Sequence, residues 1–131
     1  MRTLDAQLVA RADADQEARA AIREQLADAL PAPSLYDLLT VVTELVANAV
    51  RHGEPGLIRL RVAVESDGTI RGEVENPGKG KPEPREIDAV NGSRLGLHIV
   101  DVIAYEWEAV TPNDSTLVRF VLAPLGGETG G

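Results

Sequence analysis

Apolar residues between positions 35 and 52 recur with the period of an α-helix, and they form the strongest pattern in the chain. They follow the spacing i, i+3, i+4, i+7 and i+8 without a gap. Gly53 comes directly after them, where glycine commonly ends a helix. We therefore predict a helix over residues 35–52, with Ser34 as its N-cap. The apolar positions of this helix are Leu38, Val41, Val42, Leu45, Val46, Ala49 and Val50.

The segment before this helix is rich in Ala, Gln, Glu, Arg and Leu, which all favour helices. Three of its apolar residues recur at a spacing of four and form one stripe. Prolines then interrupt the pattern from Pro31 onward, because proline ends a helix. We therefore predict a first helix over residues 5–30. Its apolar stripe consists of Ile22, Leu26 and Leu30.

Alternation of apolar and polar residues predicts two β-hairpins. The first has the turn signal Asp67-Gly68 between its strands. Asn76 ends the second strand on the same face as the apolar residues, so we expect it to face the core. The predicted strands cover residues 58–65, 69–76, 106–111 and 115–122.

The two hairpins are separated by a long segment that has no periodicity. Residues 77–93 are rich in Pro, Gly and charge, and this is long for a connection in a compact domain. We interpret them as a functional loop, or lid. A third helix is predicted over residues 94–104, with an apolar stripe of Leu95, Ile99, Val102 and Ile103.

The order of these elements predicts the fold class. Helices, a hairpin, a loop, a helix and a second hairpin lack the alternation of a βαβ protein. We therefore predict an α+β fold, a two-layer α/β sandwich with helices on one face of a mainly antiparallel, mixed sheet. Residues 1–125 would form one domain, and residues 126–131 a disordered tail.

Composition narrows the classes of function. The chain has 131 residues and no cysteine, which excludes disulfides and thiolate metal sites. A net charge of −8 and an aromatic content of 3% argue against nucleic-acid binding. No stretch reaches the roughly 20 apolar residues that span a bilayer. Residues 1–10 lack the pattern of a secretory signal, so we expect a cytoplasmic protein without membrane partners.

Glu44 and Asn48 are the first candidates for chemistry. They lie about 40° apart around the predicted helix, on the flank of its apolar stripe. A carboxylate in such a place could act as a base toward a hydroxyl or water. An amide oxygen could bind Mg²⁺, which prefers oxygen ligands. Taken alone, such a pair is more common on a solvated helix face.

Asn76 and the glycines after it form a second group of candidates. The Asn76 amide offers a donor and an acceptor, which matches the edge of a purine base. An Asn that opens the turn before a proline is equally common. Gly78 and Gly80 alternate with two lysines, which would suit phosphate, although a solvated loop would look the same.

Gly92 and Ser93 precede the third predicted helix, whose free N–H groups could bind an anion. Ser93 is more common as an ordinary N-cap. The order of all these features nevertheless suggests an ATP site. A P-loop is excluded, because the pattern GxxxxGK[ST] does not occur in the chain.

Three sequence stretches resemble the motifs of the GHKL ATPase superfamily, which has the Bergerat ATP-binding fold. TELVANAVRHG (43–53) resembles the N box. VENPGKGKP (74–82) resembles the G1 box, whose pattern is Asp-x-Gly-x-Gly. NGSRLGLHIVD (91–101) resembles the G2 box, whose pattern is Gly-x-Gly-x-Gly. Within the superfamily, the chain looks most like small actinobacterial anti-sigma factor serine-protein kinases, and the resemblance covers about residues 34–124.

The resemblance implies roles for individual residues. Glu44 would be the catalytic base, and Asn48 would bind Mg²⁺. Arg51 and His52 fall where the family often has basic residues near the phosphates, and Thr116 fits a threonine near the adenine. The residues that would bind the nucleotide are Asn48, Arg51, His52, Asn76, Gly78, Gly80, Gly92, Ser93, Arg94, Leu95, Gly96 and Thr116.

Two positions depart from the family pattern. Asn76 stands where the family has the Asp that accepts the adenine amino group. Asn keeps an acceptor but loses the charge, so we expect ATP to bind about tenfold more weakly if about 1.4 kcal/mol is lost. Arg94 stands where the family has the middle glycine of the G2 box. It would either clash with a phosphate or replace a backbone contact by a charged one.

The resemblance implies a serine/threonine-protein kinase that uses Mg-ATP in transcription regulation. Such a protein holds a sigma factor and phosphorylates a Ser or Thr of an antagonist protein, and a homodimer is common among similar proteins. The alternative is a degenerate GHKL domain with weak or no ATP binding, which regulates by protein interaction. A histidine kinase catalytic domain is disfavoured, because the sequence shows no helix pair with a phosphoacceptor His.

Overall fold

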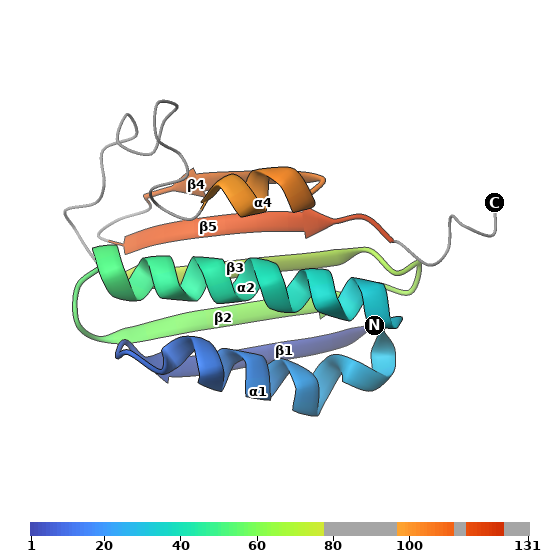
Figure 1. The fold of residues 1–131 in the computed structure, drawn as a ribbon, viewed down its shortest axis with the longest axis horizontal. Coiled ribbons are helices and arrows are strands. Elements are labelled where there is room, and N and C mark those ends of the chain that lie inside the picture. The colour runs from blue at the N-terminus through green and yellow to red at the C-terminus, as the bar shows by residue number, and fades with distance from the viewer. Residues whose placement is uncertain (78–96, 112–114, 125–131) are drawn as a thin grey trace.

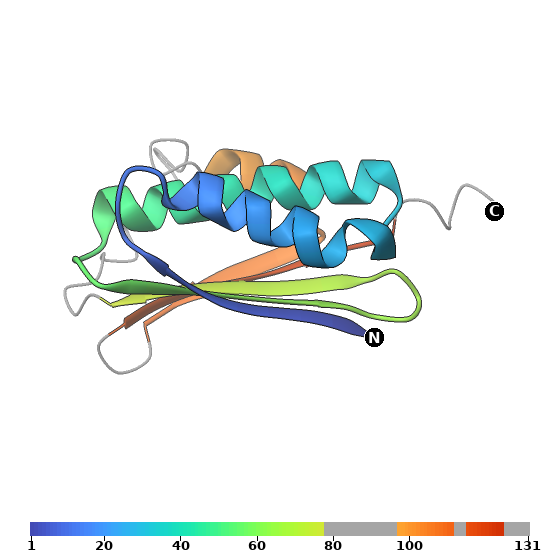
Figure 2. The same ribbon diagram turned by 90° about the horizontal axis from the view of Figure 1, so that it is seen from below.

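The structure is a computed structural model that describes residues 1–77, 97–111 and 115–124. In the described part, three α-helices cover one face of a five-stranded sheet, and the other face of the sheet carries no helix (Figures 1 and 2). The helices are α1 (Ala14–Leu26), which continues into a 3₁₀ turn (Ala27–Ala29), α2 (Ala32–His52) and α4 (Leu97–Ile103). The strands are β1 (Arg2–Val9), β2 (Leu57–Val64), β3 (Ile70–Pro77), β4 (Glu106–Val110) and β5 (Ser115–Leu122).

The sheet has the strand order β1-β2-β3-β5-β4, and every pair among the described strands is antiparallel. The predicted two-layer α+β fold is thereby confirmed. Both predicted hairpins are present as β2–β3 and β4–β5. The second hairpin joins the first through β5, so the last described strand lies inside the sheet and β4 lies at its edge. None of the helices in the described part has the length and apolar character that a membrane span requires.

The N-terminal segment contains a strand where we predicted part of a helix. The predicted helix over residues 5–30 is wrong in its first part, because α1 begins only at Ala14. Instead, β1 (Arg2–Val9) pairs with β2 along its whole length, and Leu4 and Leu8 are buried in the core. The composition favours a helix, but pairing with β2 and burial of two leucines decide for a strand.

The start of α2 also differs from the prediction. The helix begins at Ala32, after Pro31 in an extended conformation, and Pro33 stands in its first turn. A proline is tolerated there because the N–H groups of the first turn have no partner within the helix. Ser34 lies inside the helix and is only 3% exposed, so its predicted role as the N-cap is wrong.

The buried face of α4 is not the stripe that the sequence predicted. Leu97 and Val100 are buried, and Ile103 is partly buried against the core. Ile99 and Val102 are 36% and 68% exposed. Because α4 packs on α2 and β4, the direction of this docking decides which of its apolar residues are covered. Leu95, the first residue of the predicted stripe, lies outside the described residues.

Candidate functional site

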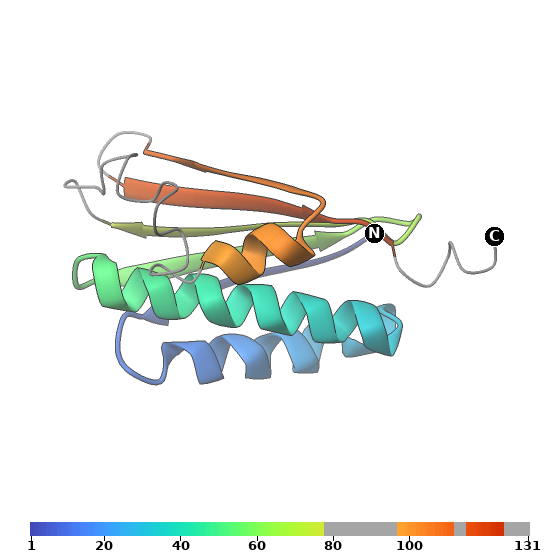
Figure 3. The same ribbon diagram turned by 45° about the horizontal axis from the view of Figure 1, so that its top comes forward.

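The elements that carry the candidate residues meet at one end of the molecule. The last turns of α2, the end of β3 and the start of β5 lie together at the left of Figure 1, and Figure 3 shows the same arrangement from another side. Helix α2 packs against β3, β5 and α4. Because β3 and β5 are antiparallel, the last residues of β3 lie opposite the first residues of β5. The backbone register pairs Asn76 with Thr116, and the structure therefore brings these two predicted residues together.

Asn76 faces the helices, as predicted, and is only 7% exposed. Its amide lies against Gly53, the residue that ends α2. A Cβ atom at position 53 would overlap Asn76 Nδ2 and lie 2.6 Å from the carbonyl oxygen of Ala49. Gly53 has a φ of −93°, which any residue adopts, so glycine is required here for space and not for backbone conformation.

The sequence predicted only that Gly53 follows the end of a helix, and the structure confirms that it is the C-cap of α2. Its N–H donates to the Ala49 carbonyl oxygen at 2.9 Å. Its second role, making room for Asn76, follows from packing between α2 and β3. No local sequence signal could have shown it.

We expect Gly53→Ala to displace the Asn76 amide, because the new methyl group has no space. Overpacking of this kind typically lowers the free energy of unfolding by about 1–3 kcal/mol. Chemical denaturation of Gly53→Ala, Asn76→Ala and the double variant measures the effect. If the overlap with Asn76 contributes, Gly53→Ala should destabilise the Asn76→Ala protein less than the parent, and the close contact with the Ala49 carbonyl oxygen accounts for the loss that remains. Additive effects would contradict this explanation.

Asn48 lies about one turn before the end of α2, and its side-chain oxygen has an unusual environment. Asn48 Oδ1 is buried, and it has no hydrogen-bond partner among the residues that the structure describes. A buried acceptor without a donor lowers the free energy of unfolding by about 1–3 kcal/mol. Such groups are rare in native proteins, and a bound ligand is one explanation for them. An amide oxygen is a suitable ligand for Mg²⁺. The residues present therefore fit a bound Mg-nucleotide, whose cation would complete the coordination of this oxygen.

Glu44 precedes Asn48 by one turn on α2 and is half-buried. Its neighbour Thr43 has a structural role that the sequence did not indicate. Thr43 Oγ1 donates to the Leu39 carbonyl oxygen at 2.7 Å and accepts from Arg19 Nη1 at 3.1 Å. The N-box stretch is thus tied to α1 beside the two polar candidates.

Arg51 and His52 occupy the last turn of α2, and both are exposed. Cations at a helix C-terminus are also stabilised by the helix dipole, so their place has a structural explanation besides phosphate binding. The described part of the site thus comprises Glu44, Asn48, Arg51, His52, Asn76 and Thr116, with Gly53 added. The remaining candidates, Gly78, Gly80, Gly92, Ser93, Arg94, Leu95 and Gly96, lie outside the described residues.

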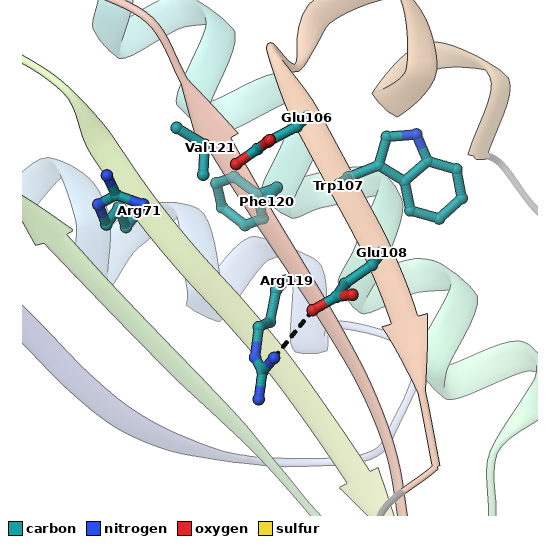
Figure 4. A pocket seen from close by; sticks show the side chains of 7 residues that line it. All are labelled: Arg71, Glu106, Trp107, Glu108, Arg119, Phe120 and Val121. Atoms are coloured by element: carbon teal, nitrogen blue, oxygen red, sulfur yellow. Dashed lines mark hydrogen bonds and ion pairs between the residues drawn. The ribbon is translucent and has the colours of Figure 1, made fainter.

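Two hollows lie on the opposite, helix-free side of the sheet, away from these residues. Their volumes are about 340 and 510 Å³. The smaller one follows β4 and β5, and an Arg119–Glu108 ion pair of 2.9 Å crosses it (Figure 4). Its lining residues are Arg71, Glu106, Trp107, Glu108, Arg119, Phe120 and Val121.

The charges of this face neutralise one another across the strands. Arg61 pairs with Glu73 at 2.6 Å, and Arg59 pairs with Asp5 at 2.9 Å. Hydrogen bonds from Arg59 lower the pKa of Asp5 below its ordinary value. Arg61 Nε is buried without a partner, but the guanidinium is already bound through Nη2. These ion pairs satisfy the charges on this face of the sheet, so the candidate residues at α2, β3 and β5 remain the candidate site.

Comparison with known proteins gives a consistent result. The model of the histidine kinase-like ATPase domain family matches residues 8–122. No curated protein sequence matches the chain. Among solved structures, the RsbU and RsbW domains of Rv1364c from Mycobacterium tuberculosis match with a TM-score of 0.72 and 23% identity, over 93% of this chain and 32% of that one. At this identity, the likeness shows the fold alone.

Two structures from Erythrobacter litoralis also match. The histidine kinase domain of the blue-light activated histidine kinase EL346 has 26% identity and a TM-score of 0.55, over 70% of this chain and 45% of that one. A second structure of this kinase has 24% identity and a TM-score of 0.60, over 76% and 33%. The chain thus spans less than half the length of each of the three structures it matches.

Proposed function

The chain belongs to the histidine kinase-like ATPase domain family, and from this membership we propose that it binds Mg-ATP between α2 and the ends of β3 and β5. The observation that carries the proposal is the buried, unpartnered Oδ1 of Asn48. It lies one helical turn after Glu44, in the stretch that resembles the N box. Asn76 and Thr116, which the register pairs, would receive the base on the other side of the site.

We further propose that the protein is a serine/threonine-protein kinase. The bound Mg-ATP would supply the phosphoryl group. Glu44 would accept the proton of the substrate hydroxyl as that oxygen bonds to the γ-phosphorus, the bond to the bridging oxygen would break, and ADP would leave. Asn48 would hold the cation through Oδ1. Arg51 and His52, exposed at the end of α2, would add positive charge for the phosphates.

The protein partners are proposed by resemblance. The motifs resemble those of anti-sigma factor kinases, so a sigma factor would be the bound protein and its antagonist the phosphorylated one. The fold shared with the RsbU and RsbW domains supports this choice, because one of these domains has the same architecture over nearly the whole chain. The cytoplasm is the expected compartment for such partners.

Isothermal titration of ATP in the presence and absence of Mg²⁺ tests the proposal. We expect saturable binding that depends on the metal, followed by transfer of labelled phosphate to a candidate antagonist. Absence of binding at millimolar Mg-ATP would contradict the nucleotide site and leave a role as a protein-interaction regulator. Strong binding without transfer to any antagonist would contradict only the kinase activity.

Glu44→Gln separates binding from chemistry. The amide keeps the size and polarity of the side chain but cannot accept a proton. We therefore expect Mg-ATP affinity to change little and the rate of phosphoryl transfer to fall by about 10²–10⁴-fold. Single-turnover transfer of labelled phosphate measures this rate. Glu24→Gln, on the exposed surface of α1, is the matched control and should keep the parent rate. Equal rates in both variants would exclude Glu44 as the base.

A further inference from the structure

The first turns of α2 carry two side chains that the proposed nucleotide site does not use. Helix α2 begins beyond the last turn of α4, so its first turns form a separate part of the helical layer (Figures 1 and 3). Tyr36, on these turns, is 69% exposed. Tyrosine is enriched in protein interfaces, where its ring packs against the partner.

Asp37, the next residue, is half-buried and has no counter-ion. None of the described residues gives it a hydrogen bond or an ion pair. Partial burial therefore raises the pKa of its carboxyl above the ordinary value. By contrast, Asp5 and Glu73 on the sheet both have arginine partners. A half-buried carboxylate without a cation costs stability, and a cation from another molecule would offset this cost.

Asp37 lies on the same side of α2 as Glu44, the proposed base. Seven residues are close to two turns of an α-helix, so the two side chains project in nearly the same direction, about 10 Å apart along the axis. An extended peptide covers about this distance in three residues. A peptide that runs along α2 with its hydroxyl at Glu44 therefore brings the residue three positions away to Asp37.

We propose that Tyr36 and Asp37 form a docking site for the segment of the protein substrate that flanks its Ser or Thr, and that this segment carries a basic residue three positions from the hydroxyl. This inference rests on the proposed kinase activity. The surface continues from Glu44 on the same helix, and α2 has no Lys, Arg or His before Arg51, so the positive charge must come from the substrate. The Asp37 carboxylate pairs with that charge, and the Tyr36 ring packs against the aliphatic part of the basic side chain.

Transfer of labelled phosphate from Mg-ATP to three synthetic peptides tests the inference. Each peptide has one Ser, and the residues three positions before and after it are both Arg, both Ala or both Glu. With the parent protein, we expect kcat/KM for the Arg peptide to exceed that for the Ala peptide by at least about fivefold, through a lower KM, because hydrogen bonds to charged groups are the stronger ones. The Glu peptide should be the poorest substrate.

Charge exchange distinguishes docking from a structural role. Asp37→Asn should remove the preference for the Arg peptide, and Asp37→Arg should reverse it in favour of the Glu peptide. A merely structural defect would change all three peptides alike. Asp13→Asn is the matched control, because it removes the same negative charge at an exposed position before α1, and it should keep the parent preference. Tyr36→Ala should raise KM for all three peptides, and an unchanged KM would overturn the part assigned to Tyr36.

The outcomes separate this inference from the proposed function. If the parent phosphorylates the three peptides with similar kcat/KM, the docking inference is wrong and the kinase activity stands. If it binds Mg-ATP in isothermal titration but phosphorylates none of them, the inference is also wrong, because it places recognition in a short segment around the hydroxyl. If Mg-ATP does not bind, the proposed function fails and the inference fails with it. A change of sedimentation behaviour in Asp37→Arg, with an unchanged peptide preference, would assign the surface to contact between two copies instead.

Discussion

Asn48→Ala is expected to weaken Mg-ATP binding by about a hundredfold and to make the nucleotide-free protein more stable. Replacing even an outer-shell partner of a metal ligand commonly costs roughly 10–100-fold in affinity, so loss of the proposed ligand itself should reach about a hundredfold. The gain in stability has a separate cause. Asn48 Oδ1 is buried without a donor, and removing such an acceptor removes a penalty of about 1–3 kcal/mol. Ala also has a higher helix propensity than Asn.

Two measurements on the same variant check this pair of effects. Isothermal titration gives the affinity, and urea denaturation without nucleotide gives the free energy of unfolding, which we expect to rise by about 1 kcal/mol. Asn48→Asp keeps an oxygen ligand and should retain metal-dependent binding. A variant that is both less stable and still binds Mg-ATP would show that Asn48 is an ordinary structural residue. A stabilised variant that loses binding is typical of a functional site.

Phe120→Ala is expected to have the largest effect on stability. Phe120 is 1% exposed and is the largest of the fully buried side chains. Replacing a buried Phe by Ala typically lowers the free energy of unfolding by about 3–5 kcal/mol. Domains of this size have a total stability of only about 5–15 kcal/mol. Urea denaturation followed by circular dichroism measures the change. Fluorescence is less suitable, because the only Trp of the chain, Trp107, lies opposite Phe120 in the sheet.

Gly72 provides the internal control for this prediction. It faces Phe120 across β3 and β5, and a Cβ atom there would overlap the Phe ring. Gly72→Ala alone should therefore destabilise the protein by about 1–3 kcal/mol. In the Phe120→Ala background, the same methyl group enters vacated space, so the combined loss should be smaller than the sum. Strict additivity would mean that the two residues do not share this space.

The periodic parts of the sequence predicted their elements well. The helix that ends at His52 and the two hairpins were confirmed, because each has a complete apolar stripe or strict alternation. Asn76 was correctly assigned to the core side of its strand by alternation alone. The resemblance of residues 43–53 to the N box led to the family that the comparison then confirmed.

Other parts of the fold could not be predicted from local pattern. β1 has the composition of a helix, and its partner β2 lies about fifty residues away in the chain. The solvent exposure of Ile99 and Val102 depends on how α4 packs against α2 and β4. In each case, a contact between segments distant in sequence overrides the local preference.

The sequence by itself determined the fold class, the family and the chemistry of the single residues that we propose for the nucleotide site. These follow from residue type and spacing, which are local properties. Only the tertiary structure decided that Gly53 makes room for Asn76, that Asn76 lies opposite Thr116, and that Asn48 has a buried oxygen without a donor. These three facts depend on how α2 packs against β3 and β5. Space, register and burial arise only when the chain folds, and they bring separate polar residues together as a candidate site.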